Sequence, residues 1–226
     1  MQYITQIHGG STGTGIDIIV PGQAITPRPT RPPIIITRPP ITEPPIIITR
    51  PPRPQIIKLL ETLSFIKVGF HLKINGFLDI RSGGSVSFKF RTLEGKGVLF
   101  FTHRQGSTNQ LFLAFEIYDG KLYFISDFGA RTRRLLISDT IVNDGTWQNI
   151  KLEFMDRKLF ISLNGIQKTL DLTREEMIQA YFNDGIYIGG YPKGFRSWYI
   201  WSEQYDEYMG CFSDLQLQNI GEFFHS

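Results

Sequence analysis

The chain is poor in cysteine, in long apolar runs and, after residue 54, in proline. Cys211 is the single cysteine among 226 residues, so no disulfide framework can form within the chain. No apolar run approaches the roughly 20 residues of a membrane-spanning helix, so we expect no membrane segment in this chain. Residues 1–6 have neither the basic nor the apolar region of a signal peptide.

The sequence also lacks the motifs of common catalytic chemistry. It contains no Gly-x-Ser-x-Gly elbow, no P-loop and no dinucleotide-binding fingerprint. Glu116 and Asp119 lie an odd number of residues apart, so on a continuing strand they face opposite sides and cannot form a glycosidase pair. The histidines do not have the spacing of metal ligands: His8, His71, His103 and His225. We therefore expect no enzymatic activity.

Proline is concentrated in one tract. Twelve of the thirteen prolines lie between residues 21 and 54, where Pro-Pro-Ile-Ile-Ile-Thr-Arg-Pro-Pro occurs twice, at 32–40 and at 44–52. Paired prolines exclude helix and remove backbone donors, which favours an extended polyproline II stalk. We expect residues 1–58 to be a disordered or polyproline II linker and residues 59–226 to be the folded domain.

The net charge of +3 is distributed unevenly along the chain. Residues 1–58 carry six cations and two anions, a net of +4, which leaves −1 for the remainder. A nucleic-acid-binding domain concentrates basic residues on its folded face. The nearly neutral remainder therefore predicts no nucleic-acid partner.

From residue 59 onward, short alternating apolar and polar stretches are separated by turn signals such as Asn-Gly and Asp-Gly. This pattern predicts an all-β, antiparallel sandwich. A capping-box pattern at residues 173–176 is the only helical signal. The expected strands are 65–74, 77–80, 85–91, 97–102, 110–118, 121–126, 134–138, 148–154, 158–163, 167–170, 185–188 and 211–217.

One hairpin carries a family resemblance. Residues 142–151 read Val-Asn-Asp-Gly-Thr-Trp-Gln-Asn-Ile-Lys, a tight turn, a tryptophan and the start of an alternating strand. The next strand ends at Asn164-Gly165, a common hairpin pair. This order of elements resembles the signature hairpin of laminin G (LNS) domains: a turn, a tryptophan, a strand, a second turn, a second strand and Asn-Gly. Gln148 departs from the pattern, because that family usually has histidine there.

Further segments support the resemblance in order and spacing across about 150 residues. They are Ser-Val-Ser-Phe-Lys-Phe-Arg-Thr at 85–92, Gly-Val-Leu-Phe-Phe at 97–101, the Asp-Gly hairpin at 113–121, Gly-Ile-Tyr-Ile-Gly-Gly at 185–190 and Met-Gly-Cys-Phe-Ser-Asp-Leu at 209–215. The likeness is greatest to neurexin-type LNS domains. It implies a laminin G-like jelly roll of the concanavalin type, with Trp147 in the core.

The resemblance also implies a function. It predicts an extracellular, non-enzymatic recognition module of a neurexin-like adhesion, receptor or matrix protein, whose rim loops bind a cell-surface or matrix protein or an anionic glycan. The alternative is a structural spacer or matrix protein in which the Pro-rich repeat is the functional part.

Laminin G domains are known for a calcium site at the rim, which takes a carboxylate at the start of one strand. The matching position here is Leu111, and an aliphatic side chain cannot bind a hard cation. Asn109 and Asp127 are weak substitutes. We expect no metal and no other cofactor, with calcium as the one candidate.

Two groups of residues are candidates for ligand binding. Arg131, Arg133 and Arg134, with Lys96 and Arg104, form a cationic set suited to an anionic glycan. Trp198, Tyr199 and Trp201 belong to an unusual aromatic insertion after the Gly-Gly strand. This insertion is either a partner-binding surface or a small satellite core over the sandwich edge.

Cys211 departs from the family in having no partner. In such domains the cysteine of this strand pairs with another a few dozen residues downstream. Either that partner belongs to a longer protein, or the thiol is free and buried like a small apolar group. Together with the missing signal peptide, this favours a fragment of a longer secreted or membrane-anchored protein.

Overall fold

The computed structural model describes residues 56–59, 61–66, 70–81, 83–106, 111–195, 200–202, 208–218 and 220–221. Almost all of the expected Pro-rich stalk lies outside these residues, as do Asn109, Trp198 and Tyr199. Strand β1 (Ile56–Leu59) begins ahead of the expected domain boundary and pairs with β15 (Gly210–Gln218).

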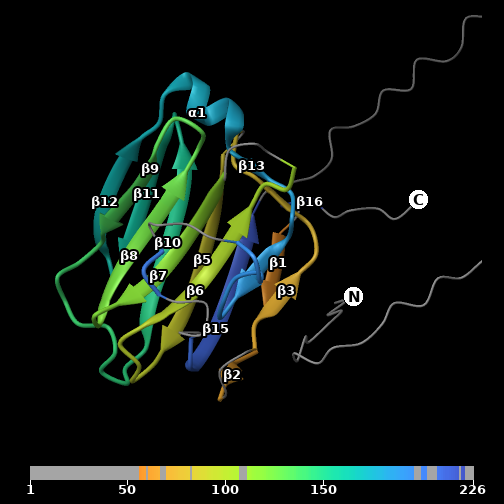
Figure 1. Cartoon of the computed structure of the whole chain (residues 1–226). Helices are drawn as coiled ribbons and strands as arrows, with labels where there is room; N and C mark the ends of the chain where they lie inside the picture. Colours follow the sequence, from red (N-terminus) through yellow and green to blue (C-terminus); the bar gives the residue numbers. More distant parts are fainter. Residues whose placement is uncertain are drawn as a thin grey trace, which may run out of the picture. The chain divides into compact units, whose positions relative to one another are not determined.

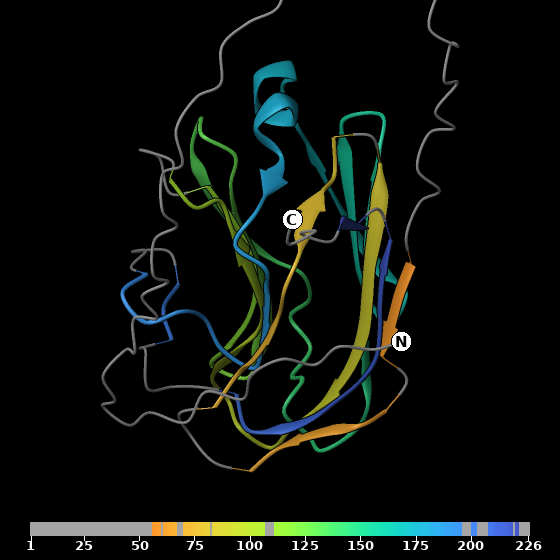
Figure 2. The ribbon, with the colours of Figure 1, turned by 90° about the vertical axis from the view of Figure 1, so that its right-hand side faces the viewer.

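Two antiparallel sheets lie face to face, so the expected β-sandwich is confirmed (Figure 1, Figure 2). The seven-stranded sheet has the order β1, β15, β5 (Gly84–Arg91), β10 (Gln148–Met155), β11 (Lys158–Leu163) and β12 (Ile166–Asp171), with β2 (Leu63–Phe65) also paired to β15. The six-stranded sheet has the order β3 (Leu72–Ile74), β14 (Ile186–Ile188), β6 (Gly97–His103), β7 (Phe112–Tyr118), β8 (Lys121–Asp127) and β9 (Thr132–Leu136).

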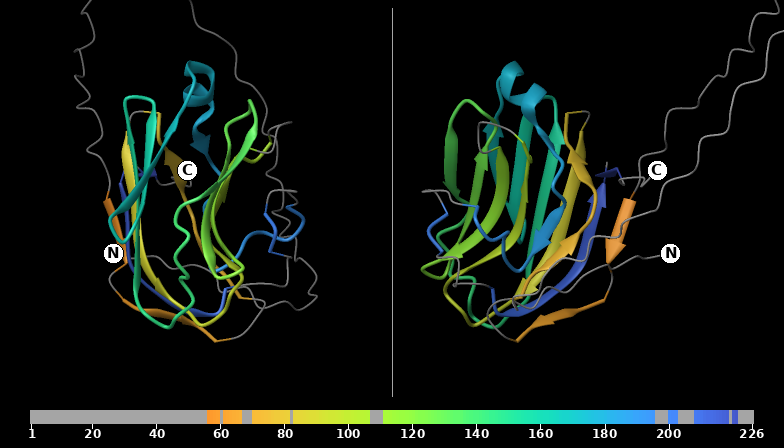
Figure 3. Two further views of the ribbon diagram at one scale, coloured as in Figure 1. Left: turned by 90° about the vertical axis from the view of Figure 1, so that its left-hand side faces the viewer. Right: turned by 45° about the vertical axis from the view of Figure 1, so that its right-hand side comes forward.

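A small third sheet and one helix lie at one end of the sandwich (Figure 3). The sheet consists of β13 (Tyr181–Phe182), β4 (Phe77–Asp79) and β16 (Ile220–Gly221). Helix α1 (Arg174–Gln179) begins with the predicted capping box. The backbone N–H of Glu176 donates to the Thr173 hydroxyl at 3.2 Å, and the Thr173 N–H donates to the Glu176 carboxylate at 2.9 Å.

The predicted single strand at 65–74 is wrong. β2 pairs with β15 in the seven-stranded sheet, whereas β3 pairs with β14 in the six-stranded sheet. The chain therefore crosses from one sheet to the other within this stretch. Local apolar content cannot reveal such a crossing, because both ends have the composition of a strand.

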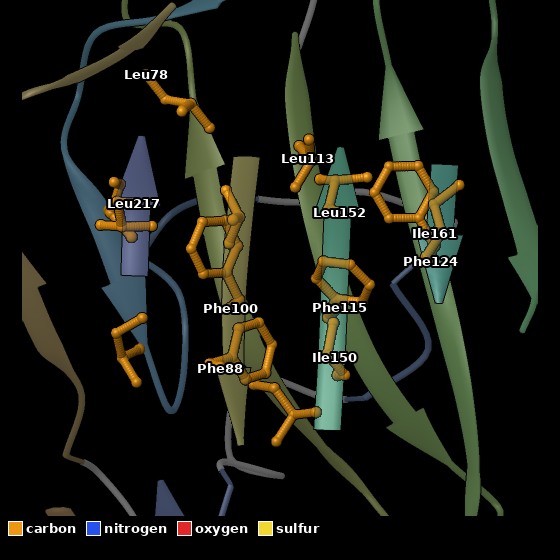
Figure 4. Packing of buried hydrophobic residues seen from close by; sticks show 14 of the residues in the cluster. Leu78, Phe88, Phe100, Leu113, Phe115, Phe124, Ile150, Leu152, Ile161 and Leu217 are labelled. Atoms are coloured by element: carbon orange, nitrogen blue, oxygen red, sulfur yellow. The ribbon is translucent and has the colours of Figure 1, made fainter. Parts of the chain in front are cut away.

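The main core fills the space between the two sheets with aromatic side chains. Phe88 of β5 stacks on Phe212 of β15, with ring centroids 4.7 Å apart, and lies 6.0 Å from Phe100 of β6. Phe115 of β7 meets Phe124 of β8 at 5.2 Å. Figure 4 shows Phe88, Phe100 and Phe115 from both sheets converging with aliphatic residues such as Leu152. Burial of these large apolar surfaces is the main stabilising contribution to the sandwich.

Candidate functional site

The outer face of the six-stranded sheet is apolar, which is unusual for an antiparallel sheet that faces water on one side. Alternation along β7 directs Leu113, Phe115 and Ile117 into the main core. The residues between them point outward, into a second cluster. Its buried members are Val98, Phe101, Phe112, Ala114, Ile125, Tyr187 and Ile200. An outward face of this composition requires a cover.

Residues 189–195 and 200–202, here called the overlay segment, provide that cover (Figure 2). The Phe195 ring lies 4.7 Å from the Phe101 ring and 5.3 Å from the Phe112 ring, measured between centroids. Tyr191 lies 5.8 Å from Phe101. Phe195 and Ile200 of the insertion therefore pack in a small second core, which lies on the sheet face rather than over an edge.

A buried ion pair fastens the overlay segment to the sheet. Glu116 of β7 is completely buried, and one of its oxygens accepts a hydrogen bond from the Ser202 backbone N–H at 2.5 Å. Its other oxygen accepts a hydrogen bond from Arg134 of β9, whose side chain is 8% exposed. A buried carboxylate is tolerated only when it is paired and hydrogen-bonded, and Glu116 has both kinds of partner.

Arg134 in turn holds an exposed tryptophan. Its guanidinium carbon lies 3.7 Å from the ring centroid of Trp201 and 4.0 Å from that of Tyr123. The Trp201 and Tyr118 rings meet edge to face at 5.2 Å. Trp201 nevertheless remains 47% exposed. We call this group the Trp201 cluster: Tyr118, Tyr123, Arg134 and Trp201. In it, several contacts hold an exposed aromatic ring in place.

The three neighbouring arginines do not form one patch. Arg133 and Arg134 are successive residues of β9, so their side chains point to opposite faces. Arg133 reaches inward to the fully buried Glu176 of α1, with Nη2 and Oε1 2.5 Å apart. Burial raises the pKa of Glu176, but hydrogen bonds from Arg133 and from the Thr173 backbone outweigh it and leave that pKa lowered. Arg131 alone is exposed.

Of the other two cations in that set, Lys96 lies near the Trp201 cluster. Its ammonium nitrogen is 5.4 Å from the centroid of the Tyr118 ring. Arg104 donates to the side-chain oxygen of Gln179 at 2.8 Å, at the end of α1. The structure thus brings Lys96, Arg134 and Trp201 into one neighbourhood, which sequence reasoning had assigned to two separate sites.

Comparisons with known proteins identify the fold. The family model for the laminin G domain matches residues 90–220, more than half of the chain. The chain belongs to the laminin G domain family. Zebrafish (Danio rerio) neurexin-3a is 32% identical over 147 residues, and rat (Rattus norvegicus) neurexin-2 is 30% identical over 148 residues. Each match covers 58% of this chain and 9% of the relative.

Solved structures agree on the fold. Domains LG4-5 of the mouse laminin α1 chain align with a TM-score of 0.51 and 20% identity, covering 63% of this chain and 39% of that one. At this identity the likeness shows the laminin G jelly roll and nothing finer. Among the described residues, no helix is both long enough and apolar enough to span a membrane.

The expected core position of Trp147 in this laminin G domain is wrong. Trp147 is 40% exposed, and its ring lies 5.1 Å from the Arg91 guanidinium carbon. Strand β10 begins at Gln148 and buries alternate residues, so Gln148 faces inward and Trp147 faces out. The Gln148 side chain bonds Asn164 at 2.6 Å and Thr146 at 2.8 Å, which ties the two hairpin turns together.

The carboxylate of Asp127, one of the two substitute calcium ligands, is already hydrogen-bonded within its own hairpin. It accepts hydrogen bonds from the Gly129 backbone at 2.7 Å and from the Thr132 hydroxyl at 2.5 Å. Leu111 is buried in the main core at 2% exposure. Among the described residues, no group of three or more His, Cys, Asp or Glu side chains is placed to hold a metal ion.

A polar cluster around Asp184 was missed by sequence reasoning, which treated this residue only as part of a turn. The Asp184 carboxylate meets His103 Nε2 at 2.6 Å, accepts from the Tyr187 hydroxyl at 2.8 Å and pairs with Lys73 Nζ at 3.2 Å. Burial raises the pKa of Asp184, but the Tyr187 hydrogen bond and the Lys73 charge together outweigh burial and leave that pKa lowered. The cluster links the outer ends of β3, β6 and β14.

Cys211 is free and half-buried at the start of β15. Its sulfur lies 3.5 Å from Arg91 Nη2 and 4.0 Å from the Ser64 hydroxyl. The thiol is therefore not buried in the core, contrary to one of the two alternatives left open by the sequence.

Proposed function

We propose that this laminin G domain is a non-enzymatic recognition module that works outside the cell, as part of a longer adhesion, receptor or matrix protein. Its family membership and its similarity to neurexins support this class of function. Its ligand is a protein or glycan of the cell surface or matrix.

The observation that carries the proposal is the Trp201 cluster. A tryptophan that is 47% exposed on a folded domain leaves apolar surface in water. Arg134 holds this ring at 3.7 Å, and the buried Glu116 holds Arg134. A side chain that is already ordered loses little conformational entropy on binding. Preorganised Trp and Arg side chains are the residue types that dominate binding energy at interfaces.

The nearby cations suit an anionic ligand. Lys96 lies beside Tyr118, a member of the Trp201 cluster, and Arg134 is itself part of that cluster. Lys96 and Trp201 together would contact an acidic group and an apolar surface on the same ligand. Trp198 and Tyr199 are proposed to extend this surface. Calcium is not required in this proposal, because the position that would supply a carboxylate is Leu111.

Binding of the labelled full chain to cultured cells tests the proposal. Trp201→Ala should weaken saturable binding by about thirtyfold or more, as loss of a central tryptophan does. Trp147→Ala is the matched control, because Trp147 is similarly exposed and similarly stacked on an arginine, but precedes β10 of the other sheet. Equal binding by wild-type protein and the Trp201 variant would refute this surface. Prior treatment of the cells with protease or with heparinase separates protein from glycan ligands.

The Pro-rich repeat supports a second candidate, a structural spacer. The observation that favours it is the nine-residue motif that occurs twice, at 32–40 and at 44–52. Removal of residues 1–52 separates the two functions: binding by the Trp201 surface should persist in the shortened chain, whereas a spacer function would be lost.

A further inference from the structure

Three two-residue hairpin turns in this domain can be compared directly. They join β7 to β8, β11 to β12 and β10 to β11, where Tyr118 pairs with Lys121, Leu163 with Ile166, and Met155 with Lys158. Their central pairs are Asp119-Gly120, Asn164-Gly165 and Asp156-Arg157. All six central residues have positive φ. Such turns strongly favour glycine at the second position, and only the β10–β11 turn departs from this rule.

The departing residue is Arg157, which has a φ of 63°. A Cβ atom is crowded in this region, so arginine adopts it at a cost in free energy that glycine does not incur. The backbone is held there because the Leu172 N–H donates to the Arg157 carbonyl at 2.8 Å. A non-glycine residue kept in a left-handed conformation points to a role for its side chain.

Arg157 lines a surface hollow of about 430 Å³. The hollow lies at the α1 end of the sandwich, because Met177 of α1 is one of its lining residues. It is bounded by the connection from β4 to β5, by the β10–β11 turn and by Met177 of α1. We call it the Arg157 hollow.

The lining combines apolar and cationic groups. Phe154, Met155 and Met177 supply apolar surface, and Met155 is 60% exposed. Methionine side chains adapt to ligands of varied shape. The cations are Arg81, Arg157 and Lys158, against the single carboxylate of Asp156.

Two of these cations are already paired. Arg81 donates to both Asp79 oxygens, at 2.8 and 2.6 Å, and Lys158 lies 3.1 Å from Asp171. For Arg157, no ion pair or side-chain hydrogen bond is found within the described part of the chain. Among the described lining residues, Arg157 is therefore the cation available to a ligand, with the Asp156 carboxylate beside it in the same lining.

We propose that the Arg157 hollow binds a carboxylate carried next to a short apolar group, as a peptide segment of a partner protein presents where an acidic residue adjoins an apolar one. Arg157 binds the carboxylate, and Met155 and Met177 contact the apolar group. A sugar fits less well, because the exposed apolar surface is methionine rather than an aromatic ring on which a sugar stacks. This site is separate from the Trp201 cluster and does not depend on it.

The four methionines make the hollow directly observable by NMR of the full chain labelled with ¹³C at the methionine methyls. Met155 and Met177 line the hollow and report on it, whereas Met209 does not line it and serves as the internal control. Hexanoate serves as the probe, hexanol as its uncharged analogue and sulfate as a charge without an apolar group. Hexanoate should shift the Met155 and Met177 signals saturably, and hexanol and sulfate should do so much more weakly.

Arg157→Gly is the decisive variant. It should weaken hexanoate binding about three- to tenfold, as loss of a charge-assisted contact at a partly exposed site does. Its melting temperature should stay the same or rise by up to about 3 °C, because glycine relieves the strained φ. Lys168→Ala, which removes an equal charge from the exposed edge strand β12, should change neither property.

Any of the following results would overturn the proposal. They are equal shifts with hexanol and hexanoate, undiminished hexanoate binding by Arg157→Gly, shifts of Met209 as large as those of Met155, and a clear fall in the melting temperature of Arg157→Gly. Sulfate that matches hexanoate would reveal a plain anion site and overturn the peptide assignment. Trp201→Ala should leave the hexanoate shifts unchanged, so failure of the Trp201 surface and failure of this hollow are distinguishable.

Discussion

At the scale of single residues, what decides a side chain's role here is the face of the strand on which it falls. Trp147 and Gln148 are neighbours, yet the larger apolar one is exposed and the polar one is buried. Glu116 lies between two core residues of β7 and points away from the main core into the overlay contact. In both cases the alternation of side chains between the two faces of the strand decides burial, and residue type does not.

Replacement of Trp147 by alanine should cost little stability. A ring that is 40% exposed loses mainly its contact with Arg91, and we expect a loss of about 1–2 kcal/mol in the free energy of unfolding. Phe88→Ala in the main core should cost about 3–5 kcal/mol. Urea unfolding of both variants measures the difference, and equal losses would place Trp147 in the core after all.

Glu116→Ala should be strongly destabilising. It leaves the buried Arg134 without its carboxylate and the Ser202 N–H without its acceptor, which should cost about 3–5 kcal/mol. Lys151→Ala removes one partner of an exposed pair with Glu153 and should cost less than about 1 kcal/mol. If calorimetry found the same small loss for both variants, the Glu116–Arg134 pair would not fasten the overlay segment. Glu116→Ala should also weaken ligand binding by loosening Trp201.

At the scale of elements, the domain is held together by contacts between strands that are distant in sequence. Asp184 precedes β14 and binds side chains from β3 and from β6. Glu116 of β7 binds Arg134 of β9 and the overlay segment. Each polar cluster thus connects strands of the six-stranded sheet across its outer face, where the apolar surface is covered.

The Asp184 cluster should make stability depend on pH in acid. Because the pKa of Asp184 is lower in the folded state, its stabilising contribution is fully present above the unfolded value of about 3.9. That contribution is lost as the pH falls through the lower folded value. Unfolding free energies measured from pH 7 to pH 2 should fall less steeply in Asp184→Asn than in wild type. Asp139→Asn, at a carboxylate 87% exposed, is the control and should follow the wild-type curve.

At the scale of the whole molecule, a laminin G domain follows the Pro-rich stretch of residues 21–54. The pairing of β1 with β15 brings the start of the domain to Ile56. The last described strand, β16, pairs with β4 in the small third sheet. This arrangement is compatible with a module carried on a linker.

Limited proteolysis should divide the full chain into a cleaved N-terminal segment and a resistant domain. We expect cleavage within residues 1–58 and a resistant fragment that begins near residues 56–59, because exposed Pro-rich and Gly-rich segments are cut in preference to a folded sheet. Mass spectrometry of the products gives the boundary. Protection of residues 1–52 would contradict the linker proposal.

Calcium should not stabilise the domain. A ligand that binds only the folded state raises stability by RT ln(1 + [L]/Kd), so even a site of about 0.1 mM would contribute over about 1 kcal/mol at a few millimolar calcium. With Leu111 at the carboxylate position, we expect identical thermal melts in calcium and in chelator. An upward shift in calcium would refute this prediction and direct mutagenesis to Asn109 and Asp127.

The sequence by itself determined the fold class, most strand positions, the capping box and the family, because alternation, turn residues and motif order are local properties of the chain. The tertiary structure alone decided which apolar side chains face water. It separated Arg131, Arg133 and Arg134, brought Lys96 to Tyr118, and placed Trp201 on Arg134. It also revealed Arg157 as a strained residue, because its φ follows from the two-residue loop that the pairing of β10 with β11 leaves. These outcomes depend on which strands pair and which segment covers the outer face. Such contacts join residues that are distant in sequence, so no short stretch of sequence can predict them.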